Sequence, residues 1–158
     1  MPISEAKPCP PAGISWLAFA GANTWLHGDE PPAPAGNGIL TAEEVTGLDL
    51  SGTELVVLSA CQTGLGKVES GEGVFGFRRS FVLAGARTVV LTLWEIPDNP
   101  TRELMEHFYL LVHDGRPRAE ALREAKLRLR ARYPDDASWA AFICQGDPDP
   151  LPNTTSNP

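Results

Sequence analysis

Cys61 stands where a cysteine nucleophile is expected, directly after a run of residues that predicts a buried strand. The strand covers residues 55–60, in which the apolar run Leu55-Val56-Val57-Leu58 precedes the small Ser59-Ala60. A continuous apolar run bounded by turn residues is typical of a strand buried on both faces. In open α/β sheets, ligands and reacting groups gather just beyond the carboxyl ends of such strands. The spacing therefore makes the Cys61 thiol the first candidate for covalent chemistry.

The turn after Cys61 has the composition that this chemistry needs. Gln62, Thr63 and Gly64 follow the thiol, and glycine lets the backbone turn sharply without a Cβ clash. If the thiolate attacks a carbonyl group, the backbone N–H of Cys61 is a natural donor to the oxyanion. The alternative is a small buried cysteine that packs as a hydrophobic residue at the end of a strand.

No histidine of the sequence is well placed to act as the base for Cys61. His27 lies upstream, as the chemistry requires, but it borders a proline-rich segment, residues 28–38, that predicts a surface loop. His27 is therefore kept only as a substitute base. His107 and His113 lie downstream, on or just past a predicted helix, and a histidine near a helix end complements the helix dipole.

Helix and strand signals alternate along the chain in the order of an α/β protein. Thr41 and Glu44 form a capping box, which predicts a short helix that ends at Gly47. Residues 74–84 have apolar residues at helical spacing, so the strands before and after them are expected to pair in parallel. The other expected elements are strands at residues 14–20, 87–94 and 138–144, a helix from a cap at Asp98 or Asn99 to Gly115, and a helix at residues 118–132. The side chains expected to face the core from the longer helices are Phe77, Phe81, Ala84, Leu104, Phe108, Leu111, Val112, Leu122, Ala125 and Leu129.

Several short motifs occur in the order and at the spacing of one domain family. They are Ala20-Gly21-Ala22-Asn23, Gly38-Ile39-Leu40-Thr41-Ala42-Glu43-Glu44-Val45, Ser59-Ala60-Cys61-Gln62-Thr63-Gly64, Gly71-Glu72-Gly73-Val74-Phe75-Gly76, Ala84-Gly85-Ala86-Arg87, Leu93-Trp94-Glu95-Ile96-Pro97-Asp98 and Trp139-Ala140-Ala141-Phe142. In these motifs the chain resembles a CHAT domain over residues 14–146. CHAT domains are relatives of the caspase-like (clan CD) cysteine peptidases, and they often stand in bacteria at the end of helical-repeat proteins.

The resemblance implies a three-layer α/β/α fold around a mostly parallel sheet, with Cys61 as the nucleophile of a cysteine endopeptidase. It also implies that Trp94, Glu95 and Asp98 line substrate subsites; the alternative is a core position for Trp94 and helix capping by Asp98. The family's base is a histidine followed by glycine, at the end of a strand that precedes the segment matching residues 20–23. No such pair occurs there, so we expect a sheet that is incomplete on its N-terminal side and a chain that is inactive alone.

Two other interpretations remain open. In one, the chain is a non-catalytic pseudo-peptidase that acts by binding other proteins. In the other, a strand with the missing histidine comes in trans from another chain, which an exposed sheet edge would favour. The expected partners are a protein or peptide substrate and, in a longer parent, a regulatory helical-repeat module of the tetratricopeptide (TPR) type.

Composition argues against several other classes of function. The 158 residues suit one domain with a sizeable core, and the formal charge of −7 argues against nucleic acid or a membrane surface as a general partner. No run approaches the ~20 apolar residues of a transmembrane helix, and residues 1–13 lack a signal-peptide pattern, so we expect a cytoplasmic protein. Residues 1–13 are predicted to be a disordered proline-rich lead, and residues 147–158 a disordered tail.

The sequence predicts no cofactor and no metal site. Its cysteines form no CxxC pair, and Cys9 and Cys144 are expected to be inert thiols. The run Gly64-Leu65-Gly66-Lys67 lacks the earlier glycine and the following Ser or Thr of a phosphate-binding loop. Seven of the 13 basic residues lie in residues 116–132, where we expect a solvated helix face in preference to a docking surface.

Overall fold

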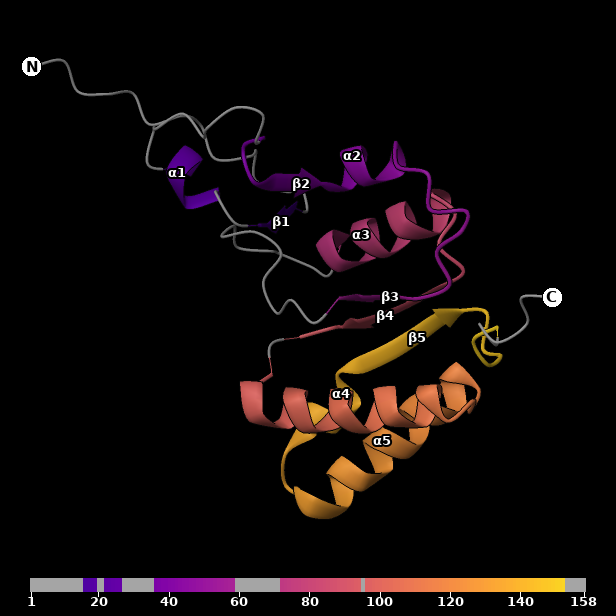
Figure 1. The fold of residues 1–158 in the computed structure, drawn as a ribbon. Coiled ribbons are helices and arrows are strands. Elements are labelled where there is room, and N and C mark those ends of the chain that lie inside the picture. Colours follow the sequence, from indigo (N-terminus) through magenta and orange to yellow (C-terminus); the bar gives the residue numbers. More distant parts are fainter. Residues whose placement is uncertain (1–15, 20–21, 27–35, 59–71, 95, 153–158) are drawn as a thin grey trace, which may run out of the picture. The chain divides into compact units, whose positions relative to one another are not determined.

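Helices and short strands alternate through the part of the chain that the computed structural model describes, residues 16–19, 22–26, 36–58, 72–94 and 96–152. The first elements are β1 (Trp16–Ala18), α1 (Ala22–Leu26), β2 (Ile39–Thr41), α2 (Ala42–Thr46), β3 (Val56–Leu58) and α3 (Glu72–Leu83). The later ones are β4 (Thr88–Thr92), α4 (Asp98–His113), α5 (Arg118–Arg132), the 3-10 helix η1 (Ala137–Ala140) and β5 (Phe142–Gly146) (Figure 1). The α/β class predicted from the sequence is confirmed.

The elements fall into two units. The first unit contains β1, α1, β2, α2 and α3, and the second contains β3, β4, α4, α5, η1 and β5. Because the chain passes from the first unit to the second before β3 and returns for α3, neither unit is a single continuous segment.

The first unit contains a small antiparallel sheet of β1 and β2, in which Leu17 lies opposite Leu40. A strand was predicted around β1, whereas β2 was missed because it lies between the proline-rich segment 28–38 and α2, and its last residue, Thr41, is also the predicted helix cap. The capping box at the start of α2 is confirmed. The Thr41 N–H donates to the Glu44 carboxylate at 2.7 Å, and the Glu44 N–H donates to the Thr41 hydroxyl oxygen at 3.2 Å.

Helix α3 presents an apolar stripe, as its spacing predicts. Phe77 and Phe81 are buried and their rings stack with centroids 6.2 Å apart. Helix α2 packs against α3, and Val45 of α2 is fully buried. The burial of such side chains stabilises this unit by roughly 1.5–3 kcal/mol for each large apolar residue.

Among the described residues, the second unit is organised around a three-stranded sheet in the order β3-β4-β5. Strands β3 and β4 are parallel, with Leu58 opposite Leu91, as the strand–helix–strand pattern predicts. Strand β5 joins β4 antiparallel, with Ile143 opposite Leu91. All of β4 is buried, whereas β3 is only half-buried, which corrects the expectation of a strand buried on both faces. The difference arises because β3 is an edge strand among the described residues.

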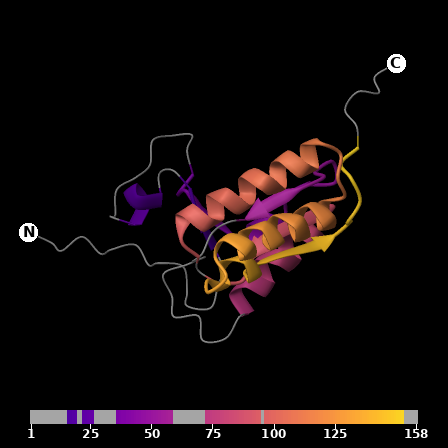
Figure 2. The same ribbon diagram turned by 90° about the horizontal axis from the view of Figure 1, so that it is seen from below.

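Helices α4 and α5 form a hairpin that packs on one face of this sheet. Figure 1 shows both helices on the same side of β3, β4 and β5, and Figure 2 shows them side by side. The predicted apolar stripes meet there, although Leu111 is only partly buried. The buried cluster comprises Val90, Ile96, Leu104, Phe108, Val112, Ala121, Leu122, Ala125, Leu129, Ala141 and Phe142. No helix of the described residues is long and apolar enough to cross a membrane.

The last strand starts later than the sequence predicts. Residues 138–140 belong to η1 because the Asp136 carboxylate accepts the Ser138 N–H at 2.7 Å and caps that turn. Strand β5 then ends at Gly146, whose φ is +105°. A Cβ at this position would overlap the Arg87 carbonyl oxygen, so only glycine lets β5 end against the start of β4.

Candidate functional site

The carboxyl ends of β3 and β4 lie together at one end of the sheet, since the two strands are parallel and Leu58 is in register with Leu91. Immediately after β4, Leu93 is 37% exposed and Trp94 is 43% exposed. Trp94 is therefore not a core residue, which was the alternative to a role in a substrate subsite. Exposed apolar side chains at the carboxyl end of β4 can contact an apolar group of a ligand.

Asp98 is the first residue of α4 and does not cap it. The N-cap is Pro97, which has no side-chain donor or acceptor, so the predicted cap at Asp98 or Asn99 is wrong. The Thr101 hydroxyl donates instead to the Pro97 carbonyl at 2.8 Å. The exposed Asp98 carboxylate lies in the first turn, where the helix dipole stabilises a negative charge.

A hollow of about 400 Å³ lies between β3 and the first three turns of α4. Val57, Ile96 and Met105 supply its apolar side, and Asp98, Arg102 and Tyr109 supply polar groups. Burial raises the pKa of Tyr109 further above physiological pH, and the neutral hydroxyl is a hydrogen-bond donor. The hollow can hold a mainly apolar side chain with one polar or charged end.

Thr92 ends β4 with an unusual feature for a buried polar residue. Its side chain is 4% exposed, and its hydroxyl has no hydrogen-bond partner among the described residues. A buried hydroxyl without a partner is destabilising unless some other group satisfies it. Thr92 is thus a candidate polar contact at the carboxyl end of β4, and the sequence contained no signal for it.

Most of the residues predicted to do chemistry lie outside the described residues. These are the nucleophile Cys61, its turn Gln62, Thr63 and Gly64, the subsite candidate Glu95 and the substitute base His27. The last described residue before the thiol is Leu58, three positions earlier at the end of β3. Of the predicted site residues, the structure brings Trp94 and Asp98 to the edge where β4 ends.

Within the part of the chain that the structure describes, the histidines and the Cys144 thiol do not form a second reactive centre, and Cys9 lies outside that part. His107 and His113 both lie on α4, and His107 Nδ1 is 3.5 Å from the cationic Arg128 side chain. Burial raises the pKa of the Cys144 thiol, while the charge of Arg118 lowers it more weakly, so Cys144 lacks the thiolate character of a nucleophile. The described residues contain no group of three His, Cys, Asp or Glu side chains able to hold a metal ion.

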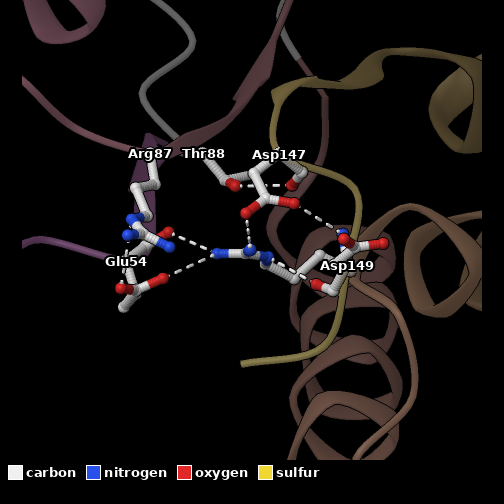
Figure 3. A network of polar contacts seen from close by, with 6 residues as sticks. Glu54, Arg87, Thr88, Asp147 and Asp149 are labelled. Atoms are coloured by element: carbon white, nitrogen blue, oxygen red, sulfur yellow. Dashed lines mark hydrogen bonds and ion pairs between the residues drawn. The ribbon is translucent and has the colours of Figure 1, made fainter. Parts of the chain in front are cut away.

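Arg118 forms a buried polar cluster that sequence reasoning missed. Its side chain is 1% exposed, and its Nε donates to the Asp149 carbonyl at 2.7 Å. One terminal nitrogen donates to the Glu54 carbonyl at 2.7 Å, and the other pairs with the Asp147 carboxylate at 3.0 Å. Figure 3 shows Glu54 and Arg87 on one side of this network and Asp147 and Asp149 on the other. Arg118 therefore ties α5 to the segment before β3 and to the segment after β5.

The Arg118 cluster corrects two expectations. Arg118 was counted in a solvated basic face, although it is buried. Residues 147–152, expected within a disordered tail, are described, and the carbonyls of Pro148 and Asp149 accept the first N–H groups of α5 at 3.3 Å. One sequence signal existed, since a cation in the first turn of a helix opposes the helix dipole unless other groups neutralise it.

Comparison with known proteins gives two results. The sequence model of the CHAT domain family matches residues 11–147. Human tetratricopeptide repeat protein 28 is 32% identical to the chain over 110 residues, and the mouse protein of the same name is 31% identical over 110 residues. Each alignment covers 68% of this chain but only 4% of the relative, so the chain spans a small fraction of these proteins.

Proposed function

The chain belongs to the CHAT domain family, and we propose from this premise that it carries the nucleophile half of a cysteine endopeptidase site. In this proposal Cys61 is the nucleophile, and Gln62, Thr63 and Gly64 form the turn that presents it. The base is a histidine on a further strand, which lies in a longer polypeptide or in another chain. TPR repeats, which the names of the two relatives mention, would regulate the site from the same polypeptide or from a partner.

The proposed reaction is acyl transfer in two steps. The histidine takes the proton of the Cys61 thiol, and the thiolate attacks the peptide carbonyl to form a tetrahedral oxyanion held by backbone N–H groups. The histidine returns the proton to the leaving amine as the C–N bond breaks. Water, deprotonated by the same histidine, then hydrolyses the thioester and releases the new carboxylate.

The observation that carries the proposal is the position of β3. This strand leads to Cys61 within three residues, it is parallel to the buried β4, and it is half-buried at an edge with no partner on its outer side among the described residues. Unpaired backbone groups at an edge favour the addition of another strand. A strand added in parallel along the outer side of β3 would have its carboxyl end beside the carboxyl end of β3. A histidine that follows the added strand would then lie near Cys61.

The exposed groups after β4 support a peptide as the substrate. Leu93 and Trp94 are exposed directly after β4, and the hollow beside Asp98 can receive one side chain of the peptide. We propose that Trp94, Glu95 and Asp98 contribute to the subsites, with the neighbouring Tyr109 hydroxyl as a further donor.

This proposal predicts that the 158-residue chain alone has little or no peptidase activity. A missing general base lowers the rate by roughly 10²–10⁴-fold, and a missing oxyanion donor by roughly 10²–10³-fold. The test mixes the chain with a synthetic strand peptide that ends in His-Gly and follows cleavage of a peptide library by mass spectrometry. Cleavage should appear only in the mixture and should be lost in Cys61→Ala. The matched control Cys144→Ala removes the thiol whose pKa burial raises and should leave cleavage unchanged.

A non-catalytic binding role is the second candidate. Exposed apolar residues after β4 and on α4, including Trp94, Tyr109 and Leu110, favour it, because such side chains also suit protein contacts. This candidate predicts no cleavage in any mixture and slow alkylation of Cys61 by iodoacetamide at neutral pH. Cleavage that survives in Cys61→Ala would contradict the peptidase proposal, since the nucleophile would then be another residue.

A further inference from the structure

Among the described residues, the outer edge of strand β5 pairs with no other strand, and its hydrogen-bonding groups can be assigned from its two ends. At one end the Leu93 N–H donates to the Ala141 carbonyl at 3.0 Å, and at the other the Asp147 N–H donates to the Arg87 carbonyl at 3.0 Å. The N–H and C=O of one residue in an antiparallel strand point to the same side, and successive residues alternate. Every second residue from Ala141 to Asp147 therefore faces β4. The residues whose backbone groups face away from β4 are Phe142, Cys144 and Gly146.

Only part of this outer edge is occupied. The Phe142 carbonyl accepts a hydrogen bond from Lys126 Nζ at 2.8 Å. No described residue pairs with the outward backbone groups of Cys144 or Gly146, and β5 is the last strand of the sheet that the described residues form. An extended segment can add to such an edge through main-chain hydrogen bonds.

An apolar groove of about 380 Å³ with a cationic rim lies beside the same edge. Its apolar part is formed by Leu122, Leu127, Trp139, Phe142 and Ile143, together with the half-buried Cys144. Leu127 is 45% exposed, so the groove is open to a ligand. The only charged residues among those that line it are Arg123 and Lys126, although the chain as a whole carries a formal charge of −7.

We propose that the β5 edge and this groove, which we call the β5 groove, bind an extended segment of a partner protein that carries both apolar and acidic residues. The unpaired backbone groups select an extended conformation, the groove accepts apolar side chains, and Arg123 and Lys126 select carboxylates over cations. Burial lowers the pKa of Lys126, and a carboxylate bound beside it would raise that pKa again. The β5 groove lies at the opposite end of the strand order from β3, so this inference does not rest on the proposed peptidase function.

The test measures binding of rhodamine-labelled peptides by fluorescence anisotropy. The probe is the octapeptide (Val-Glu)₄, and (Val-Lys)₄ is its charge-reversed control. We expect (Val-Glu)₄ to bind at low salt, (Val-Lys)₄ to bind at least about tenfold more weakly, and added salt to weaken the binding of (Val-Glu)₄. Equal affinity for the two peptides, or no binding of (Val-Glu)₄ at millimolar concentration, would overturn the proposal.

Two pairs of variants separate the rim from the edge. Arg123→Glu should weaken (Val-Glu)₄ binding about tenfold, because it exchanges an attraction for a repulsion, whereas Arg79→Glu at an exposed position of α3 should leave it unchanged. Cys144→Pro removes an outward N–H without breaking a bond to β4 and should abolish binding, whereas Cys144→Val keeps that N–H and should retain it. Circular dichroism checks that each variant is folded.

A second copy of this chain is the competing occupant of the β5 edge. Sedimentation equilibrium would reveal it as a dimer that Cys144→Pro converts to a monomer and that (Val-Glu)₄ does not dissociate. That result would overturn the assignment to an acidic partner segment. Retained (Val-Glu)₄ binding by the folded Cys144→Pro and Arg123→Glu proteins would also overturn it.

Discussion

Arg118→Met is the substitution that most directly tests how this chain holds its second unit together. Methionine keeps a long apolar stem but removes every donor of the guanidinium group. The Arg118 side chain is 1% exposed and joins Glu54, Asp147 and Asp149, which come from segments before β3 and after β5. Its loss should therefore weaken contacts between parts of the unit that are distant in the sequence.

We expect Arg118→Met to lower the free energy of unfolding by about 3 kcal/mol. Two hydrogen bonds of 2.7 Å run from the guanidinium group to the Asp149 and Glu54 carbonyls, and each charge-assisted bond contributes roughly 1.5–3 kcal/mol. The Glu54 and Asp147 side chains are 29% and 32% exposed, so water can solvate their carboxylates once the arginine is gone. The effect should therefore stay at the lower end of the roughly 3–5 kcal/mol typical of breaking a buried ion pair.

The assay is urea denaturation followed by tryptophan fluorescence. With an m-value of about 2 kcal/mol/M, the midpoint should fall by about 1.5 M for Arg118→Met. Arg118→Lys keeps the charge, but the lysine cannot reach all three partners, so its urea midpoint should lie between those of Arg118→Met and the wild type. The control Arg102→Met removes an exposed ion pair with Glu106 and should change stability by at most about 0.5 kcal/mol. Equal midpoints for Arg118→Met and Arg102→Met would refute the reasoning.

Three further predictions concern single positions. Gly146→Ala should destabilise the chain by at least about 2 kcal/mol in urea denaturation, because φ at this position is +105° and a Cβ would overlap Arg87. The control Gly52→Ala, where a Cβ has open space, should change stability by less than about 1 kcal/mol. The pKa of Asp147 is lowered, first by the Asp149 N–H and then by Arg118. The contribution of the Asp147 carboxylate to stability is therefore present above its ordinary pKa and is lost as the pH falls below about 4. Asp147→Asn should make acid unfolding less steep, and an unchanged slope would contradict this. Thr41→Ala should lower stability by about 1 kcal/mol through loss of the capping box, as measured by thermal denaturation, and no change would show that the α2 cap contributes nothing.

The helices could be predicted because their signals are local. Apolar residues at intervals of three and four predicted the stripes of α3, α4 and α5, and Phe77, Phe108 and Leu129 are buried as expected. The parallel pairing of β3 and β4 followed from the helix between them. The family also followed from short motifs, and the match of the CHAT family to residues 11–147 confirms it.

The errors occurred where the outcome depends on residues far apart in the sequence. Strand β2 forms by pairing with the distant β1, whereas the local signal at its last residue, Thr41, is that of a helix cap. Residues 138–140 have a strand-like composition, but the Asp136 side chain diverts them into η1. The half-buried state of β3 depends on which strands lie beside it, and the sequence of β3 carries no information about its neighbours.

The sequence by itself determined the family, the long helices and their apolar faces, and the position of Cys61 after a strand. These features depend on side-chain periodicity and on short motifs, which are properties of contiguous residues. Tertiary structure alone decided that Arg118 is buried, because its partners Glu54 and Asp149 lie 64 and 31 positions away. It also decided that β3 and β5 are edge strands of the described sheet, since pairing across a sheet joins segments that no local pattern connects.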